Sequence, residues 1–299
     1  MQSILVLTGP TAVGKTALSL ALAERIGAEI VSVDSRQIYR ELVIGTAPPS
    51  HAERERVMHH LIEIWPLEAP LSAGIYVREA EACIRAILAR GKTPLVVGGS
   101  TLYLAALQDG LADIPDVTPE LRETINMRLI EEGAEALYRE LERVDPASAA
   151  TMDASKSQRL VRALEVYYGS GRPLSHYHGL RQAPAFTYRT IILNTDREVL
   201  YDRIDRRVDA MLDAGLVDEV RGLLTRYGPH LPALRTIGYQ EPIAMLQGQI
   251  DAEEMRQLIQ RNTRRYAKRQ LTWFRRFDGY QWMDVDEAMA DPYHLLAGL

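Results

Sequence analysis

Cysteine is almost absent from this sequence. The 299 residues contain one, Cys83, so the chain can build neither a disulfide framework nor a cysteine-based zinc site. No apolar run approaches the length of a membrane span, and the N-terminus lacks the basic start of a signal peptide. We therefore expect a cytoplasmic protein with no membrane partner, in which Cys83 is a small core residue of a helix.

Positive charge is in deficit over the whole chain but is concentrated in one segment. Lys and Arg total 35 against 40 Asp and Glu, a formal net charge of −5, which by itself does not suggest a nucleic-acid-binding protein. Residues 255–277, however, contain eight basic residues and no acidic one. On a single helix, seven of them fall within an arc of about 140° and form a basic stripe: Arg261, Arg264, Arg265, Lys268, Arg269, Arg275 and Arg276.

This basic stripe favours binding to a polyanion. A helix face that is only solvated usually carries acidic side chains four positions from its basic ones, and this segment has none. The alternative is an ordinary amphipathic helix with solvated arginines. Tyr266 and Trp273 lie opposite the stripe, where core packing is the better interpretation.

The most informative motif is GPTAVGKT at residues 9–16. It follows an apolar run at 4–7 and precedes a helical pattern at 17–25, which is the strand–loop–helix context of a phosphate-binding P-loop. Backbone N–H groups and the helix N-terminus would hold a phosphate. The ammonium of Lys15 would reach the outer phosphate, and the Thr16 hydroxyl would ligate Mg²⁺. The motif does not distinguish ATP from another pyrophosphate, and its predicted residues are Gly9, Pro10, Thr11, Ala12, Val13, Gly14, Lys15 and Thr16.

A carboxylate, Asp34, follows an apolar strand pattern at the sheet edge where the P-loop also opens. In ordinary P-loop NTPases a second strand ends in an Asp that serves Mg²⁺, whereas the other candidate strand here, at 94–99, ends in glycines and hydroxyls. Asp34 is therefore a metal-side carboxylate or a general base, and the alternative is a turn or N-cap residue. The pair His59-His60 lacks partners at ligand spacing, so a structural role is favoured over a metal site.

Strand and helix patterns alternate in the first part of the chain, which predicts an α/β fold: a P-loop-type parallel sheet core with helices on both faces. A Pro- and Asp-rich break at 110–119 and a second break at 179–185 enclose an almost wholly helical stretch, after which a β-branched run returns at 190–193. We expect a core in two parts, an all-helical insertion domain and C-terminal helices that include the basic one. The predicted boundaries are 1–114, 115–183 and 184–299.

A set of short segments, taken in order, resembles a known family. They are GPTAVGKT (9–16), VDSRQIYR (33–40), IGTA (44–47), HHLI (59–62), GGSTLYL (98–104), QRLVRALEVY (158–167), IGY (237–239) and RRYAKRQ (264–270). Only the first is a common motif alone. The ordered set spans nearly the whole chain and resembles the bacterial tRNA dimethylallyltransferases. The chain departs from that family at 71–76. The family often reads Tyr-Ser-Ala with an aromatic residue shortly after it, whereas this chain reads LSAGIY.

The resemblance implies transfer of a dimethylallyl group from dimethylallyl diphosphate to N6 of the adenosine just 3′ of the anticodon in tRNA, with release of diphosphate. It implies that the P-loop holds the donor diphosphate, with Mg²⁺ on Thr16, and that the basic stripe meets tRNA. By resemblance, Asp34 is the general base and Arg207 stabilises the leaving group, so that the catalytic residues are Thr16, Asp34 and Arg207. The tRNA contacts that it implies are Asp34, Ser35, Arg36, Gln37, Ser100, Arg122, Gln158, Arg159, Leu160, Val161 and Arg162, to which the stripe adds Arg265, Lys268 and Arg269.

The expected partners are therefore the anticodon stem-loop of tRNA and dimethylallyl diphosphate. We expect the protein itself to be a monomer. Two other functions explain part of the sequence. A small-molecule kinase with ATP in the P-loop accounts for GPTAVGKT and Asp34 but leaves the basic stripe and the insertion without a role. A non-catalytic tRNA-binding protein accounts for the stripe but gives no role to Lys15 and Asp34.

Overall fold

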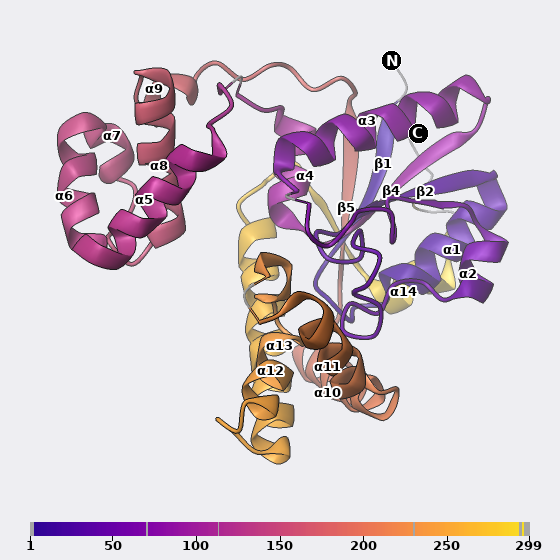
Figure 1. Ribbon diagram of the computed structural model, residues 1–299. Helices are drawn as coiled ribbons and strands as arrows, with labels where there is room; N and C mark the ends of the chain where they lie inside the picture. The colour runs from indigo at the N-terminus through magenta and orange to yellow at the C-terminus, as the bar shows by residue number, and fades with distance from the viewer. Residues whose placement is uncertain (1–2, 70, 113, 230, 293–294, 296–299) are drawn as a thin grey trace. The chain divides into compact units, whose positions relative to one another are not determined.

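The computed structural model describes residues 3–69, 71–112, 114–229, 231–292 and 295. The chain divides into two compact units (Figure 1): unit 1 comprises Met1–Gln108 and Ala185–Leu299, and unit 2 comprises Asp109–Pro184. Unit 2 begins before the expected position 115 because the two connecting segments pair with each other. Ala112 bridges Arg181, and the Gln182 N–H donates to the Leu111 carbonyl at 3.0 Å.

Unit 1 is built on a six-stranded sheet whose paired strands are parallel, in the order β3-β2-β4-β1-β5-β6. The inner strands are rich in Val, Ile and Leu and are buried on both faces, as a covered parallel sheet requires. The predicted parallel sheet is confirmed, whereas the short strands β3 and β6 are not predicted from the sequence. The strands are β1 (Ile4–Thr8), β2 (Ala28–Val33), β3 (His59–His60), β4 (Thr93–Gly98), β5 (Tyr188–Asn194) and β6 (Gln281–Asp284).

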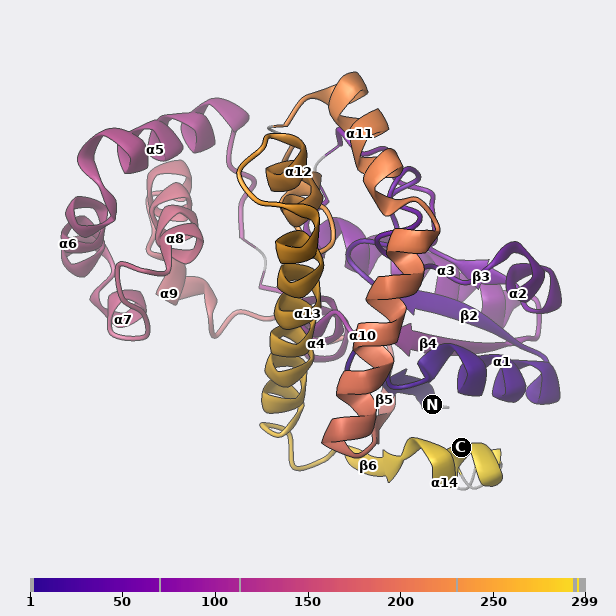
Figure 2. The same cartoon turned by 90° about the horizontal axis from the view of Figure 1, so that it is seen from below.

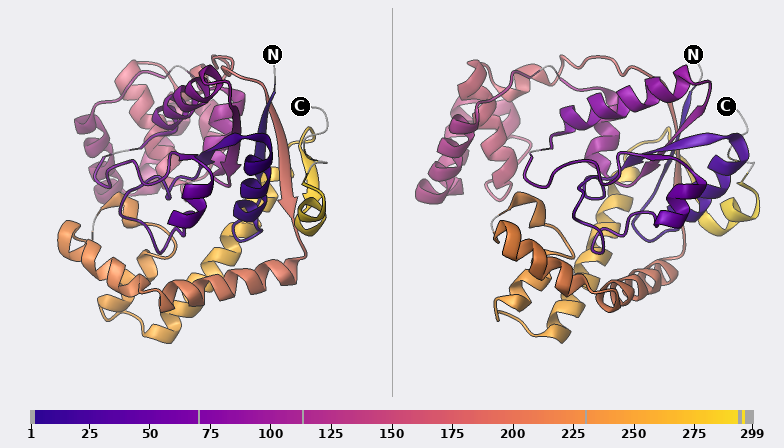
Figure 3. Two further views of the ribbon diagram at one scale, coloured as in Figure 1. Left: turned by 90° about the vertical axis from the view of Figure 1, so that its right-hand side faces the viewer. Right: turned by 45° about the vertical axis from the view of Figure 1, so that its right-hand side comes forward.

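Helices cover both faces of the sheet, as predicted (Figures 1 and 3). Because successive side chains of a strand point to opposite faces, β1 contributes Ile4 and Val6 to one core and Leu5 and Leu7 to the other. The first core is closed by α3 (Ala73–Ala89) and α4 (Thr101–Asp109), and the second by α1 (Lys15–Ile26) and α14 (Val285–Ala290). The short α2 (His51–Arg56) is tied to α1 by an Arg56–Glu24 ion pair of 2.7 Å.

After β5 come the predicted C-terminal helices, including the basic one. Carboxylate N-caps set two of the starts: Asp196 accepts from the N–H groups of Glu198 and Val199, and Asp251 accepts from that of Glu254. The helices α10 and α13 run side by side (Figure 2). None of the described helices is both long and apolar enough to cross a membrane. The elements are α10 (Arg197–Asp213), α11 (Leu216–Tyr227), the 3-10 turn η1 (Pro232–Leu234), α12 (Gln240–Leu246) and α13 (Ala252–Phe274).

Unit 2 is helical and has a core of its own. Side chains such as Ile125, Leu137, Leu141 and Leu164 are almost fully buried within it. The first helix is N-capped by Thr118, whose hydroxyl accepts from the Leu121 N–H. Its helices are α5 (Pro119–Glu132), α6 (Ala134–Val144), α7 (Pro146–Ala149), α8 (Ser157–Ser170) and α9 (Leu174–Tyr177).

Candidate active site

The loop between β1 and α1 has the backbone of an anion-binding loop. Gly9 has a φ of 150°, and a Cβ there would lie 2.6 Å from the Leu193 carbonyl oxygen, so the position requires glycine. Ala12 and Gly14 also have positive φ values, of 64° and 111°. The loop ends where α1 begins, at Lys15, so its N–H groups and the positive end of the helix face the same space.

Lys15 is held inside this loop. Its Nζ donates to the Gly9 carbonyl at 3.0 Å and to the Pro10 carbonyl at 2.8 Å. Burial and the nearby positive charge of Arg207 lower the pKa of Lys15 to about 8, and the charge of Asp34 opposes this shift. Two cations therefore stand close together in a poorly hydrated site, an arrangement that favours a bound anion.

A buried amide side chain joins the loop to α13. The Gln270 side chain accepts from the Thr11 N–H at 3.0 Å through Oε1 and donates to the Gly99 carbonyl at 2.7 Å through Nε2. Gln270 is 3% exposed, so both ends of its amide are satisfied by the protein. The carboxyl end of β4, the P-loop and the basic helix are thus fixed to one another at a single side chain.

Asp34 follows β2 and caps a turn. Its Oδ1 accepts from the N–H groups of Arg36 at 2.8 Å and Gln37 at 3.2 Å, so the turn role considered as an alternative is present. Next to it, the Ser35 N–H donates to the Ser100 hydroxyl at 2.9 Å. Among the residues that the structure describes, no hydrogen bond reaches Oδ2 of Asp34, which leaves this oxygen for a ligand.

Two adjoining cavities meet at Asp34. The P-loop cavity, of about 430 Å³, is lined by Lys15, Thr16 and Gln270 and by apolar side chains that include Ile30, Ile62 and Val97. The second cavity, of about 350 Å³, has both polar and apolar lining residues: Ser35, Arg36, Thr46, Arg235, Thr236, Gly238, Gln240 and Arg269, with Ile204, Val208, Met211, Ile237 and Ile259. Four residues line both cavities and so form their junction: Thr11, Asp34, Arg207 and Tyr266.

Two arginines of α10 face the P-loop. Arg203 donates to the Val13 carbonyl at 3.1 Å, and Arg207, one helical turn later, donates to the Thr46 carbonyl at 3.0 Å. Burial lowers the pKa of Arg207, and the charge of Asp34 opposes this shift. Their four-residue spacing places both guanidinium groups on one side of the helix, so α10 supplies positive charge beside the loop.

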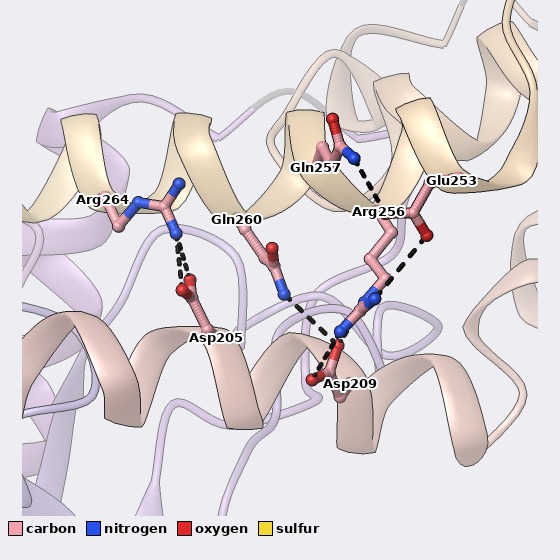
Figure 4. Close-up of polar contacts among 7 residues, drawn as sticks. All are labelled: Asp205, Asp209, Glu253, Arg256, Gln257, Gln260 and Arg264. Carbon is pink, nitrogen blue, oxygen red and sulfur yellow. Dashed lines mark hydrogen bonds and ion pairs between the residues drawn. The ribbon is translucent and has the colours of Figure 1, made fainter.

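The basic stripe of α13 is partly neutralised by α10 (Figure 4). Arg264 pairs with Asp205, with an Nη1–Oδ2 distance of 2.6 Å, and Arg256 pairs with Asp209 at 2.7 Å. The neighbouring helix thus supplies acidic partners to Arg264 of the stripe and to Arg256, which lies outside the stripe. The remaining members of the stripe are exposed, four of them on α13 (Arg261, Arg265, Lys268 and Arg269) and two beyond its last residue, Phe274 (Arg275 and Arg276), where the single helix expected from the sequence has ended.

The sequence favours core packing for Tyr266, but this interpretation is wrong in that the residue also lines the site. Its ring lines both cavities, and the Arg269 guanidinium lies 5.7 Å from the ring centroid. Burial raises the pKa of Tyr266 to about 12, and the charge of Asp34 adds to the shift. Trp273 instead packs against the core beside Phe274, as expected.

The two histidines have separate partners. His60 lies 2.7 Å from a carboxylate oxygen of the buried Glu29, and the His59 ring nitrogen Nδ1 lies 2.8 Å from the Val57 carbonyl. Burial lowers the pKa of His59. His60 thus ties β3 to Glu29 of β2, which is a structural role, whereas His59 also lines the P-loop cavity.

Unit 2 carries the remaining predicted tRNA contacts. Arg122 and Arg162 both contact the buried Glu165, at 3.0 and 3.5 Å, while Gln158 and Arg159 are exposed. Leu160 and Val161 are 0% and 6% exposed and belong to the core of this unit. Their side chains pack inside the helical unit, so a tRNA contact at these two positions stays a prediction that only their backbone could satisfy.

A family model described as IPP transferase matches residues 37–277. The chain is also 59% identical over 290 residues to a tRNA dimethylallyltransferase from Salinibacter ruber, a match that covers 96% of this chain and 90% of that protein. The chain belongs to the IPP transferase family. A relative from Trichlorobacter lovleyi, also named tRNA dimethylallyltransferase, is 46% identical over 291 residues, 96% of this chain and 95% of its own length.

Solved structures from the IPP transferase family share the fold. A full-length tRNA isopentenylpyrophosphate transferase from Bacillus halodurans is 35% identical, with a TM-score of 0.73 over 100% of this chain and 96% of its own. A eukaryotic dimethylallyltransferase described as acting on tRNA is 27% identical, with a TM-score of 0.79 over 95% of this chain and 74% of its own. The similarity therefore extends over both units.

Several residues of this IPP transferase site were not selected from the sequence. Gln270 lies in the RRYAKRQ segment, and Arg203 lies one turn before Arg207, so a neighbouring motif or helical spacing could have indicated them. Arg235 and Thr236, which line the second cavity, come directly before the IGY segment at 237–239, so that segment could have indicated them too.

The donor set of this IPP transferase family member fits Mg²⁺ brought by a diphosphate. Thr16 is exposed and lines the P-loop cavity together with Asp34. Mg²⁺ usually keeps several waters and takes one or two protein oxygens besides substrate phosphates. The described residues contain no cluster of three or more His, Cys, Asp or Glu side chains that could hold a metal ion, which is compatible with such sparse ligation.

Proposed function

We propose that this chain transfers a dimethylallyl group from dimethylallyl diphosphate to N6 of the adenosine 3′-adjacent to the anticodon in tRNA. The observation that carries the proposal is the placement of Asp34 and Arg207 at the junction of two cavities. One cavity has a phosphate-binding loop and an apolar wall, which suit an allylic diphosphate. The other carries Arg36, Arg235 and Arg269 beside apolar side chains of α10 and α13, which suits the phosphate and base of a nucleotide.

The chemistry follows from this placement. As the bond between the allylic carbon and the diphosphate oxygen breaks, N6 bonds to that carbon and its proton passes to Asp34 Oδ2. A positioned base contributes about 10²–10⁴-fold. The loop N–H groups, Lys15 and Arg207 stabilise the charge that develops on the diphosphate. Mg²⁺, held by Thr16 and the donor, would neutralise part of the same charge.

The proposal also gives roles to the charged surfaces. A target base must leave its stack to enter a cavity, at a cost of a few kcal/mol, which phosphate contacts of basic side chains offset. On unit 1 the proposed contacts are Asp34, Ser35, Arg36, Gln37, Arg265, Lys268 and Arg269, with Ser100 fixing the Ser35 backbone. On unit 2 they are Arg122, Gln158, Arg159 and Arg162. We propose that the chain acts as a monomer in the cytoplasm.

A small-molecule kinase is the second candidate, since a P-loop also binds ATP. Thermal unfolding with Mg²⁺ and either dimethylallyl diphosphate or ATP separates the two. A ligand at 100 times its Kd adds about 2.7 kcal/mol to the free energy of unfolding. We expect that stabilisation with the allylic diphosphate and a far smaller one with ATP. A strong shift with ATP and none with the allylic diphosphate would favour the kinase.

A further inference from the structure

Two segments of the resemblance, IGTA (44–47) and IGY (237–239), have no role in the chemistry above, yet they pack against each other in unit 1. A Cβ at Gly45 would lie 2.5 Å from the Tyr239 ring, so glycine is required there. Tyr239 is fully buried. The loop at 43–46 therefore rests directly on the tyrosine ring.

A carboxylate from a third element ties the two segments together. Glu219 of α11 accepts from the N–H groups of Val43 at 3.2 Å, Ile44 at 2.7 Å and Gly45 at 3.3 Å. It also accepts from the Tyr239 hydroxyl at 2.7 Å. Burial and the Glu219 charge raise the pKa of Tyr239, so its hydroxyl stays protonated and donates. A carboxylate has room for about four donors, and all four places are filled.

The loop that Glu219 holds leads directly to the site. The Thr46 carbonyl accepts from Arg207 at 3.0 Å and from the Gln37 side chain at 3.1 Å. Gln37 in turn donates its backbone N–H to Asp34. One carbonyl thus orients both the arginine beside the P-loop and the turn that carries the carboxylate. The position of the Thr46 carbonyl depends on the backbone of the three residues before it, to which Glu219 binds.

We propose that Glu219 is a positioning residue for the transfer reaction: it fixes the loop at 43–46 so that the Thr46 carbonyl holds Arg207 against the leaving diphosphate. This inference rests on the proposed function. Glu219 itself lines neither cavity, so it acts through the loop and not on the substrate. The Tyr239 hydroxyl holds Glu219 in place as the fourth hydrogen-bond donor to its carboxylate.

The test begins with Glu219→Gln. An amide has one acceptor end and one donor end, so an NH₂ group would face N–H donors and release part of the loop. We expect kcat to fall about 10²-fold, the scale of a small misplacement of reacting groups, while KM for tRNA changes less than about threefold. Asp218→Asn is the matched control, because Asp218 directly precedes Glu219 on α11. Its side chain is 77% exposed and, among the described residues, forms an ion pair only with Arg221.

A double-mutant cycle with Arg207→Gln decides whether Glu219 acts through the arginine. If it does, adding Glu219→Gln to Arg207→Gln lowers kcat little further, because the two changes remove one interaction. Multiplicative losses would overturn the positioning role. If Glu219→Gln does not fold, Tyr239→Phe replaces it in the cycle, since it removes the hydroxyl and keeps the ring. A wild-type protein without transfer activity would instead overturn the proposed function.

Discussion

At the scale of single residues, Asp34 uses its two oxygens differently. Oδ1 holds the turn through the N–H groups of Arg36 and Gln37, and this leaves Oδ2 at the junction of the cavities. The same residue can therefore be a turn carboxylate and a base. The two interpretations that compete in the sequence are compatible in the folded chain.

Asp34→Asn separates these two roles. The asparagine oxygen can still accept from the turn, but an amide cannot take the N6 proton. We expect turnover to fall about 10²–10⁴-fold while tRNA binding and the thermal unfolding midpoint stay close to those of the unaltered protein. Single-turnover transfer and tRNA filter binding measure both. Near-normal turnover would exclude Asp34 as the base.

Lys15 gives diphosphate binding a characteristic pH dependence. Its pKa in the free protein is about 8, below the usual 10.5, so it is charged below pH 8 and becomes neutral above. A diphosphate favours the charged form, so affinity is full below about pH 8 and falls as the pH rises. Burial of the charged lysine also lowers the free energy of unfolding of the free protein. This destabilisation is at its full size below pH 8 and disappears as the pH rises toward 10.5.

Calorimetry with inorganic diphosphate checks this dependence on either side of pH 8. Diphosphate itself titrates in this range, so Lys15→Arg, which stays charged, is the reference. We expect the unaltered protein to lose affinity with rising pH more steeply than the variant. Parallel curves would show that Lys15 does not contact the diphosphate.

At the scale of elements, α13 serves two surfaces at once. Arg256 and Arg264 pair with α10, and Gln270 enters the P-loop region, while Arg265 and Lys268 face solvent. The helix thus joins an exposed basic face to the P-loop cavity. Its basic character is structural on one side and free for a ligand on the other.

Replacing Arg265, Lys268 and Arg269 with Gln tests the exposed side. Each phosphate contact contributes roughly −0.7 to −0.9 to the slope of log affinity against log salt. We expect the triple variant to flatten this slope by about two units and to weaken binding to all tRNAs alike. The matched control replaces three exposed arginines elsewhere on unit 1 with Gln: Arg78, Arg206 and Arg221.

Two outcomes would contradict this account of the stripe. Equal changes in the triple variant and its control would mean that binding follows net charge alone. Unchanged affinity in the triple variant would make the stripe a solvated face and leave tRNA binding to unit 2. Circular dichroism of each variant distinguishes a lost contact from an unfolded helix.

At the scale of the whole molecule, the sequence predicts what depends on local pattern. Apolar runs and helical periodicity indicate β1, β2, β4, β5 and the main helices, because each element is long enough to show its period. The strand β3 has two residues and β6 has four, too few to carry a pattern. These elements form because neighbouring strands offer them hydrogen-bonding partners.

The site residues also divide into those that the sequence predicts and those that only the folded chain brings together. The P-loop and Asp34 are visible in sequence because strand, loop and ligand groups are adjacent in the chain. The contacts of Gln270 and Glu219 are not, since Gln270 binds an N–H group 259 positions away and Glu219 binds N–H groups 174 to 176 positions away. Leu160 and Val161 show the converse, since a contiguous motif includes positions whose side chains belong to the core of unit 2.

The most direct test of the proposed function is transfer of labelled dimethylallyl diphosphate to tRNA by the unaltered protein with Mg²⁺, read by mass spectrometry of the nucleosides. The account predicts label on N6 of the adenosine 3′ to the anticodon, with one diphosphate released for each group transferred. Asp34→Asn should abolish nearly all of it, and a tRNA with guanosine at that position should accept none. Release of diphosphate without labelled tRNA, or label at another nucleoside, would contradict it.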